Sequence, residues 1–503
     1  METYDKLLKK SKELYQFYTG LNVLRWDLQT YMPPKGMKQR SAQLAFMSKI
    51  SHRMATDGEL EGLVAILEKK GDKLNFEQNR EVELIRRSLD RTSNVPEDLV
   101  AAESSQRTMT ISAWKKAKEK NKWKLFESEL IPMLEISKKK ADIVMEGIGA
   151  KSQLDALMDT WEPRMTTKIV NAVFKDLRKQ LIPRVKKYSS VCEDVRTDFK
   201  TRKVPVNIQR KLLTDIAGVV GFDTTSENAG GRIDQSEHPF TTGYYDDIRI
   251  TIFFLEEDFS RSIFGGLHES GHAIHRQNLN PDWKWMYLGD KCSSGFSESQ
   301  ARFVENMIGR SSEFWSFYFP QFVKHTNGIF NDITSQEFLQ AINIVKPSKI
   351  RVMADEMTYA LHVIIRFEIE QDLFDNKIDV SDIPEIWKAK YEKYLGVEIE
   401  TDTEGALQDI HWSWAYWGYF PSYALGNLYA AMIREKITSD MPEWSNDLAE
   451  GHVAKPIQWL IENVHRKSNL YDPSEMINKI TGKSLTAKPF IDYLDTKYAS
   501  IFG

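Results

Sequence analysis

The spacing of apolar residues over the first 150 positions is typical of helices. Apolar side chains recur every three or four residues, from Leu7 and Leu14 to Ile85 and Leu89. Proline and glycine interrupt the pattern near positions 33–36 and 71, and Pro96 precedes two acids, a combination that opens a helix. We therefore expect a helical layer over about residues 1–150, followed by further helices.

The pattern changes in the middle of the chain. Residues 221–243 are polar and contain two adjacent glycines, and we expect a long loop there. Apolar and polar residues then alternate within 244–255, from Ile248 to Phe254, which predicts a strand with one buried face. The strand leads into the next helix, where it could pair with an extended peptide through main-chain hydrogen bonds.

That next helix carries the chemical signal of the sequence. It reads His268-Glu269-x-x-His272. Residues four apart lie on one face of a helix, so His268 and His272 can offer two imidazole nitrogens to one metal ion. Glu269 lies beside them and can take a proton from a water without being a ligand. The motif predicts a metal-dependent hydrolase.

A third ligand is needed to complete such a site. The HExxHxxGxxH pattern is excluded, because His275 and Asn278 stand where its glycine and third histidine belong. A helix expected over 295–306 instead offers Glu298 in its first turn. We take Glu298 as the third ligand and Glu305 as the competing choice.

A different class of metal protein also has to be considered. Glu269-x-x-His272 and Glu462-x-x-His465 share the spacing of di-iron carboxylate bundles. That arrangement leaves His268 without a role and needs two further glutamates. We keep it as the alternative.

Composition and charge narrow the class of protein. The chain has 503 residues and a net charge of -4, which gives no sign of nucleic-acid binding. A basic run from Trp114 to Trp123 is better explained as a solvated helix face. We expect no membrane segment, and the two cysteines, Cys192 and Cys292, favour a reducing cytoplasm.

Two more clusters combine polar and apolar residues. Arg351 and Asp355 lie in an apolar run that we expect to be helical, as an ion pair or with the guanidinium free for a carboxylate. Gln408 and His411 precede a stretch dense in aromatic residues that ends at Tyr423. From their position we expect His411 or Tyr423 to donate to the developing oxyanion.

Taken together, these clusters resemble the thermostable, Taq-type HExxH metallocarboxypeptidase family over nearly the whole chain. The motifs that carry the resemblance appear in order: Trp26-Asp27 with Met32-Pro33, His-Pro-Phe at 238–240, Asp-x-Arg-x-Thr at Asp247, Arg249 and Thr251, HExxH at 268–272, Ile-Arg-x-x-Ala-Asp at 350–355, and Gly-x-x-Gln-Asp-x-His-Trp at 405–412. One position departs from the family pattern, because Ser297 stands where the family has a histidine.

The resemblance implies a mainly α-helical enzyme with one domain over residues 1–503, a long substrate groove and a small sheet beside the HExxH helix. The N-terminal layer would cover the groove, and about 235–430 would hold the metal and substrate sites. The family is usually homodimeric, binds zinc or sometimes cobalt, and removes residues one at a time from peptide C-termini. The residues that would contact the substrate are His238, Asp247, Arg249, Arg351 and Gln408.

HExxH by itself does not distinguish an exopeptidase from an endopeptidase. A carboxypeptidase must recognise a free C-terminal carboxylate with a fixed cation near the metal. Arg351 is our first candidate, because its apolar surroundings strengthen such a pair, and Arg249 on the expected strand is the second. A broad-specificity carboxypeptidase is the prediction, and an HExxH endopeptidase is the alternative.

Overall fold

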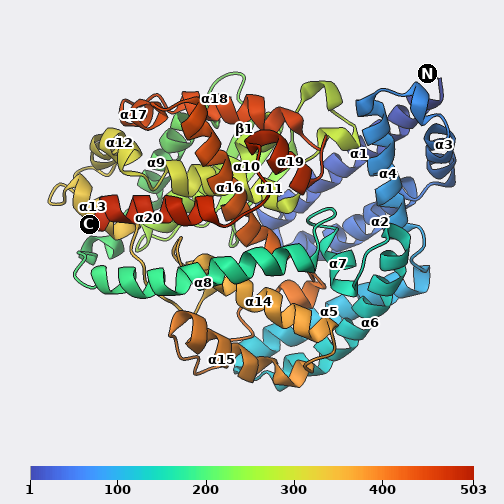
Figure 1. Ribbon diagram of the computed structural model, residues 1–503, viewed down its shortest axis with the longest axis horizontal. Helices are drawn as coiled ribbons and strands as arrows, with labels where there is room; N and C mark the ends of the chain where they lie inside the picture. Colours follow the sequence, from blue (N-terminus) through green and yellow to red (C-terminus); the bar gives the residue numbers. More distant parts are fainter. Residues whose placement is uncertain (1) are drawn as a thin grey trace.

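Helix α10 (Phe259–Gln277), which carries the HExxH motif, lies at the centre of the fold in a computed structural model that describes residues 2–503. Figure 1 shows it among helices. It contacts a small sheet and α11 (Ser294–Arg302), and α11 in turn packs against α16 (Phe420–Asp440). The apolar residues of α10, including Ile263, are buried in the main core. The mainly α-helical fold class is confirmed.

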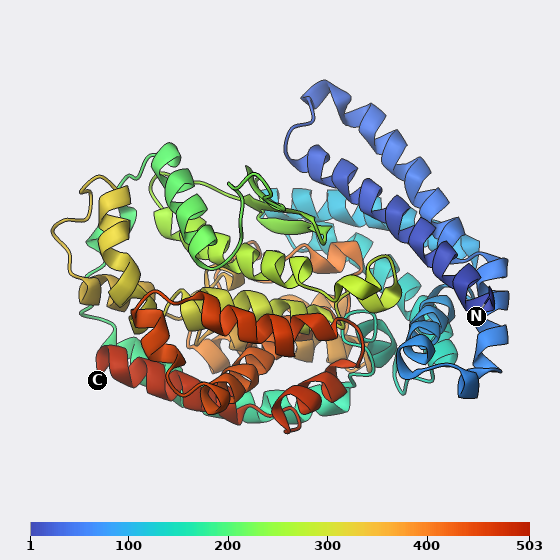
Figure 2. The same cartoon turned by 90° about the horizontal axis from the view of Figure 1, so that it is seen from above.

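The first four helices form a layer with a small core of its own. They are α1 (Glu2–Gln29), α2 (Met37–Ala55), α3 (Gly58–Glu68) and α4 (Phe76–Thr92). Leu7, Val64 and Ile85 are fully buried in this separate cluster. In Figure 2, α1 and α2 project from the body as an antiparallel hairpin, and α2 has no buried residue.

The remaining helices build the body around the main core. Prediction and structure agree on the start of α5 after Pro96, and Thr166 caps α8 with its side chain. Their bounds are α5 (Glu97–Lys120), α6 (Lys124–Ile148), α7 (Gln153–Met158), α8 (Thr167–Val191), α9 (Val206–Val219), α12 (Ser312–His325), α13 (Ser335–Ile342), α14 (Tyr359–Phe374), α15 (Ile383–Leu395), α17 (Trp444–Ala449), α18 (Ala454–Asn463), α19 (Pro473–Thr481) and α20 (Lys488–Phe502).

The sheet has the strand order β1-β3-β2. Strand β3 (Asp247–Ile252) is the predicted strand, shorter than expected, with Ile248, Ile250 and Ile252 fully buried. It pairs in parallel with β1 (Gly231–Gln235) and antiparallel with β2 (Phe240–Tyr244).

The long loop predicted over 221–243 is therefore wrong, because β1 and most of β2 lie inside it. Both are short edge strands with polar side chains, so their sequence lacks the apolar alternation that marked β3. Since β3 is paired on both sides, β1 and β2 each keep an outer edge without a partner strand among the described residues, and all five residues of β2 are half-buried.

None of the helices within 2–503 is both long enough and apolar enough to cross a membrane.

Candidate metal and active site

Two histidines of α10 face the same side at the centre of the molecule. Asp258 caps the helix with its side chain, and the rings of His268 and His272 lie 5.0 Å apart, nearly perpendicular. Gly271, between the two, lets α11 approach closely, because a Cβ there would lie 2.6 Å from the Gln300 carbonyl oxygen. The HExxH spacing and the glycine together bring α11 against the histidines.

Helix α11 supplies the third donor. Glu298 Oε2 lies 3.7 Å from His268 Nε2 and 3.6 Å from His272 Nε2. Donors about 2.1 Å from a tetrahedral metal are separated from one another by roughly 3.4 Å. The three side chains therefore fit a divalent metal ion in both spacing and chemistry, with two imidazole nitrogens and one carboxylate. Glu298 begins the second turn of α11, slightly later than predicted.

The surroundings keep Glu298 and His272 in the forms that bind metals. The pKa of His268 is raised, because the opposing effect of its burial is outweighed by Glu298 and Glu305. Burial alone would raise the pKa of Glu298, but Arg302 and the two histidines hold that pKa well below its usual value. Arg302 Nε donates to Glu298 Oε1 at 2.7 Å. Burial lowers the pKa of His272 and so favours its neutral imidazole. An ionised carboxylate and a neutral imidazole are the ligand forms.

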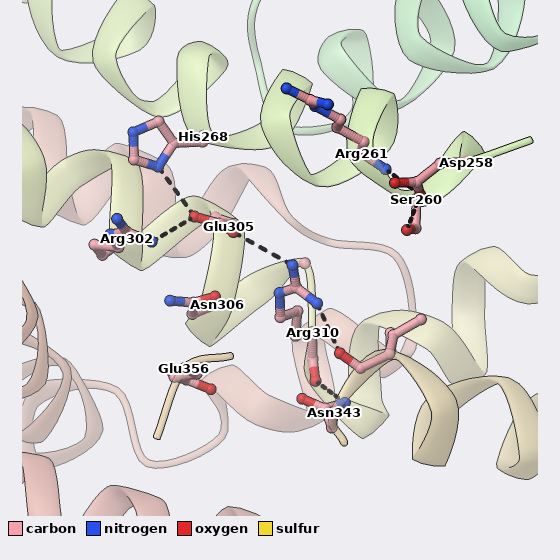
Figure 3. Close-up of polar contacts among 12 residues, drawn as sticks. Asp258, Ser260, Arg261, His268, Arg302, Glu305, Asn306, Arg310, Asn343 and Glu356 are labelled. Carbon is pink, nitrogen blue, oxygen red and sulfur yellow. Dashed lines mark hydrogen bonds and ion pairs between the residues drawn. The ribbon is translucent and has the colours of Figure 1, made fainter. Parts of the chain in front are cut away.

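Glu305, the competing ligand, lies on the other side of the His268 ring. Its Oε2 is 3.0 Å from His268 Nδ1, and it also accepts from Arg302 at 3.1 Å and from Arg310 at 3.4 Å (Figure 3). It belongs to a π-helix, Phe303–Ile308, a form of helix that is frequent at functional sites. Among the described residues, Glu298 and not Glu305 converges with Nε2 of both histidines.

Ser297, the residue that departs from the family pattern, contacts the outer nitrogen of His272 as Glu305 contacts that of His268. Ser297 Oγ lies 3.0 Å from His272 Nδ1, and Ser297 is buried. The hydroxyl therefore occupies the outer side of the second imidazole, as Glu305 does for the first. Such contacts fix the tautomer and orientation of a histidine that ligates a metal.

Glu269 is not one of the converging donors, and its carboxylate contacts β2. Glu269 is 7% exposed. Thr241 Oγ1 donates to Glu269 Oε2 and, at 3.2 Å, to the main-chain oxygen of Glu269. No sequence pattern marks Thr241, since its role depends on the position of an edge strand. The free carboxylate oxygen is available to accept a proton beside the metal donors.

Arg351 is buried, but not in the setting that we expected. The predicted helix over 350–355 is wrong, since only Arg351–Met353 form a short 3-10 turn, and Asp355 bonds Thr358 and Lys346 instead of Arg351. Arg351 pairs with Asp409 at 2.7 Å and donates to Tyr359 Oη at 3.1 Å. Helix periodicity alone could not show that a residue far along the chain, Asp409, would be the partner.

Asp409 accepts from a second guanidinium as well. Arg366 Nε donates to its Oδ2 at 2.6 Å, and although burial opposes it, Arg351 and Arg366 hold the pKa of Asp409 well below its usual value. Two buried guanidinium groups thus surround one carboxylate, which leaves one excess positive charge at this end of the site.

His411 and Tyr423 lie beside this charged group. His411 Nε2 is 3.2 Å from Tyr423 Oη, and the Arg351 guanidinium lies 5.0 Å from the centre of the Tyr423 ring. Burial lowers the pKa of His411 to about 3 and raises that of Tyr423 well above its usual value. Both side chains are neutral at physiological pH, so the phenol can donate a hydrogen bond.

The other substrate-binding candidates differ in how accessible they are. Gln408 accepts from Arg351 N and Arg366 and donates to main-chain oxygens, so the protein itself occupies its amide. Asp247 and Arg249 form a two-bond ion pair at 2.8 Å, and Arg249 lies 4.3 Å from the Trp26 ring. His238 is exposed, and its carbonyl accepts from Ser236.

The di-iron alternative is wrong for the part of the chain that the structure describes. His465 is buried and lies 2.9 Å from Gln300 Oε1, while Glu462 is exposed and accepts from Gln458. Neither belongs to a group of converging metal donors within residues 2–503. The helix that carries Glu462 ends before His465, so the two side chains do not share one helix face.

The comparison with known families decides the class. A model of the carboxypeptidase Taq (M32) metallopeptidase family matches residues 6–498. The chain belongs to this family.

Relatives of this M32 member match along their full length. It is 36% identical to carboxypeptidase 1 of Bacillus subtilis, with 100% of this chain and 99% of the relative covered. It is 31% identical to thermostable carboxypeptidase 1 of Thermus thermophilus, with 99% of each covered. The M32 carboxypeptidase of Deinococcus radiodurans superimposes with a TM-score of 0.95 at 32% identity, with 100% of each chain covered. The resemblance predicted from the motifs is confirmed.

Proposed function

We propose that this M32 metallocarboxypeptidase hydrolyses the last peptide bond of peptides with a free C-terminus, with His268, His272 and Glu298 holding one zinc ion. Cobalt is the other metal that these donors suit. The observation that carries the proposal is the convergence of three metal donors, two of which share helix α10 with Glu269. A bound divalent metal supplies Lewis-acid polarisation of the water and of the scissile carbonyl.

The protein's own groups supply the proton transfers. Glu269 accepts a proton from the attacking water and passes it to the leaving amine. Thr241 donates to one carboxylate oxygen of Glu269 and so fixes which oxygen faces the water. Tyr423, with His411 at its hydroxyl, donates a hydrogen bond to the carbonyl oxygen as negative charge develops there.

Recognition of the free C-terminus is assigned to Arg351. Its guanidinium shares Asp409 with Arg366, so the positive charge there is only partly neutralised. Arg302 and Arg351 both lie against the Tyr359 ring, at 4.3 and 6.0 Å from its centre, which links this cation to the metal ligand Glu298. Arg249 is the weaker candidate, because Asp247 neutralises it in a two-bond pair.

The main chain of the peptide is proposed to lie along β2, in a groove covered by the N-terminal layer. The outer edge of β2 has no partner strand in the sheet, and Thr241 on this strand already contacts Glu269. An extended peptide can pair with a free edge through main-chain hydrogen bonds and so tolerate many side chains. This supports broad specificity, with two further substrate-binding candidates close to β2: His238 precedes the strand by two residues, and Asp247 of β3 pairs with Tyr244 at its other end.

We also propose that the enzyme works as a homodimer in the cytoplasm, without nucleic-acid or membrane partners. Cys192 and Cys292 are both buried and unbridged, as expected for a reducing compartment. The net charge of -4 supports the absence of a nucleic-acid partner.

One experiment tests the activity directly. The zinc-loaded protein is incubated with a set of peptides that have a free C-terminal carboxylate and with the same peptides C-terminally amidated, and the products are followed by mass spectrometry. We expect stepwise C-terminal trimming of the free acids and little cutting of the amides. Internal cleavage of both sets at equal rates would exclude the carboxypeptidase activity.

A further inference from the structure

Arg276 lies on the metal-facing side of α10. It follows His272 by four residues, as His272 follows His268, so the three side chains lie along one face of the helix. Arg276 is half-buried, and its one hydrogen bond among the described residues goes to the Gly243 carbonyl of β2, at 3.4 Å. It has no carboxylate partner within residues 2–503.

Lys291 approaches the same place from the segment before α11. Its side chain is half-buried, and its ammonium has neither a hydrogen bond nor an ion pair to the residues that the structure describes. Burial lowers the pKa of Lys291, and Arg276 is the next contribution in the same direction. Asp290 and Glu162 are in its surroundings but do not pair with it.

Contacts of the neighbouring main chain bring together the segments that carry the two cations. Arg276 donates to the Gly243 carbonyl. Tyr245, two residues after Gly243, donates its hydroxyl to the Gly289 carbonyl at 3.2 Å, and Gly289 lies two residues before Lys291. The segment that carries Lys291 is fixed on both sides: Glu81 accepts from Leu288 N at 2.8 Å, and Ser294 N donates to the Trp161 carbonyl at 2.8 Å.

The other arginines around the site all have acidic partners. Arg302 pairs with Glu298, Arg351 with Asp409, and Arg249 with Asp247. A half-buried pair of like charges is costly unless an anion compensates it, and a charge-assisted bond to a carboxylate is strong in such a place. Arg276 and Lys291 are therefore arranged for an anion that the protein itself does not supply.

We propose that Arg276 and Lys291 form a subsite for the acidic side chain of a glutamate or aspartate in the peptide substrate. This assignment rests on the proposed function and adds a substrate class to it. Arg276 is one helical turn, about 5.4 Å along the axis, beyond His272, and an extended peptide advances about 3.3 Å per residue. The acidic residue therefore lies within about two residues of the scissile bond.

The test compares glutamate with glutamine in otherwise identical peptides. The zinc-loaded full-length enzyme is given N-acetylated, free-acid peptides with Glu or Gln placed in turn at each of the last three positions. At one position we expect kcat/KM to favour Glu by about tenfold or more, the ratio expected for a charge-assisted hydrogen bond. Equal rates for Glu and Gln at all three positions would overturn the subsite.

Variants then assign the preference to the two cations. In Arg276→Gln and in Lys291→Met the ratio of kcat/KM for the Glu peptide to kcat/KM for the Gln peptide should fall toward one. Arg276→Lys should restore part of this ratio. The double variant Arg276→Glu, Lys291→Glu should prefer a peptide with Lys over one with Glu at the same position. Arg261→Gln, an exposed arginine at the start of the same helix, is the control and should keep the wild-type ratio. Thermal unfolding followed by circular dichroism verifies that each variant is folded.

Other outcomes separate the competing explanations. A Glu preference that persists in both single variants would refute the assignment. Loss of discrimination between free-acid and amidated peptides, with the Glu to Gln ratio unchanged, would show that the pair binds the terminal carboxylate and not a side chain. If the wild-type enzyme cleaves no peptide, the proposed function fails, and calorimetric binding of the Glu and Gln peptides to the same protein still decides the subsite.

Discussion

Ser297 Oγ lies 3.0 Å from Nδ1 of His272, on the side of the ring opposite Glu298. A hydroxyl thus holds this histidine, where Glu305 holds His268 through a carboxylate. The two imidazoles differ in the basicity that their partners confer, since a carboxylate strengthens a histidine ligand more than a neutral hydroxyl does.

Removal of this hydroxyl should weaken metal binding without unfolding the protein. We expect Ser297→Ala to lower zinc affinity by roughly 10-fold to 100-fold, because His272 loses the contact that fixes its tautomer. Competition with a chromogenic chelator measures the change. Ser299→Ala is the control: Ser299 is equally buried in α11 but bonds the Phe296 carbonyl. Equal losses in both variants would assign the effect to packing.

The ligand assignment predicts different results for the two glutamates around His268. Glu298→Ala should lose the metal at stoichiometric zinc, because it removes a donor. Glu305→Gln should keep it, with affinity lower by roughly 10-fold to 100-fold, since only an outer contact changes. Metal content after dialysis is measured by atomic absorption. If Glu305→Gln is the variant that arrives without metal, the assignment is wrong.

The role of Glu269 can be separated from metal binding. Glu269→Gln should retain one metal ion per chain and lose nearly all turnover, because an amide cannot accept the proton. Thr241→Val should lower kcat more than it changes KM, and Thr241→Ser should restore the rate, since the serine hydroxyl can make the same bond to Glu269. Wild-type kcat in Thr241→Val would remove the positioning role.

Arg351 is expected to discriminate between a terminal acid and an amide. Arg351→Met should lower kcat/KM for free-acid peptides by an amount that corresponds to a loss of about 2 kcal/mol of transition-state stabilisation. For amidated peptides kcat/KM should fall much less. Asp409 would keep Arg366 as its partner, which limits the structural damage. Kinetics on matched acid and amide peptides measure both. If the ratio of kcat/KM for acid to kcat/KM for amide peptides is unchanged in Arg351→Met, Arg249 is the residue that binds the terminal carboxylate. Arg249→Met would then be the variant that lowers this ratio.

A buried glutamate that is not one of the metal donors should set part of the pH dependence of stability. Burial raises the pKa of Glu370 to about 8, although it accepts from Trp412 Nε1 and Gly418 N. The folded state then binds more protons than the unfolded state between pH 4.5 and 8, so this contribution is complete below pH 4.5 and is lost as the pH rises toward 8.

Urea unfolding at pH 5 and pH 8 measures this contribution. The wild-type free energy of unfolding should fall more over that interval than that of Glu370→Gln, by about 1–3 kcal/mol. Equal changes in the two proteins would contradict a raised pKa at this position. Comparing the difference between the two proteins removes the parallel contributions of Glu81 and Glu162, whose pKa values burial raises to about 7.

The sequence predicted those parts of the site that depend on local spacing. His268, Glu269 and His272 share a helix, so their relative placement follows from helix geometry, and Glu298 needed only one further helix nearby. Two other pairs, Arg351 with Asp409 and Glu269 with Thr241, depend on tertiary contacts between distant segments. The periodicity of a sequence does not predict such contacts. The strands β1 and β2 were missed because edge strands with polar side chains resemble loops.

The absence of buried residues in α2 has a consequence for hydrogen exchange. Its amides are protected by helix hydrogen bonds and by contact with α1, and the apolar burial that resists opening lies in the small core formed by α1, α3 and α4. Opening α2 therefore exposes little new apolar surface and should cost far less than global unfolding. Amide protons of Met37–Ala55 should exchange with little dependence on urea concentration, whereas those of α10 should exchange through global unfolding.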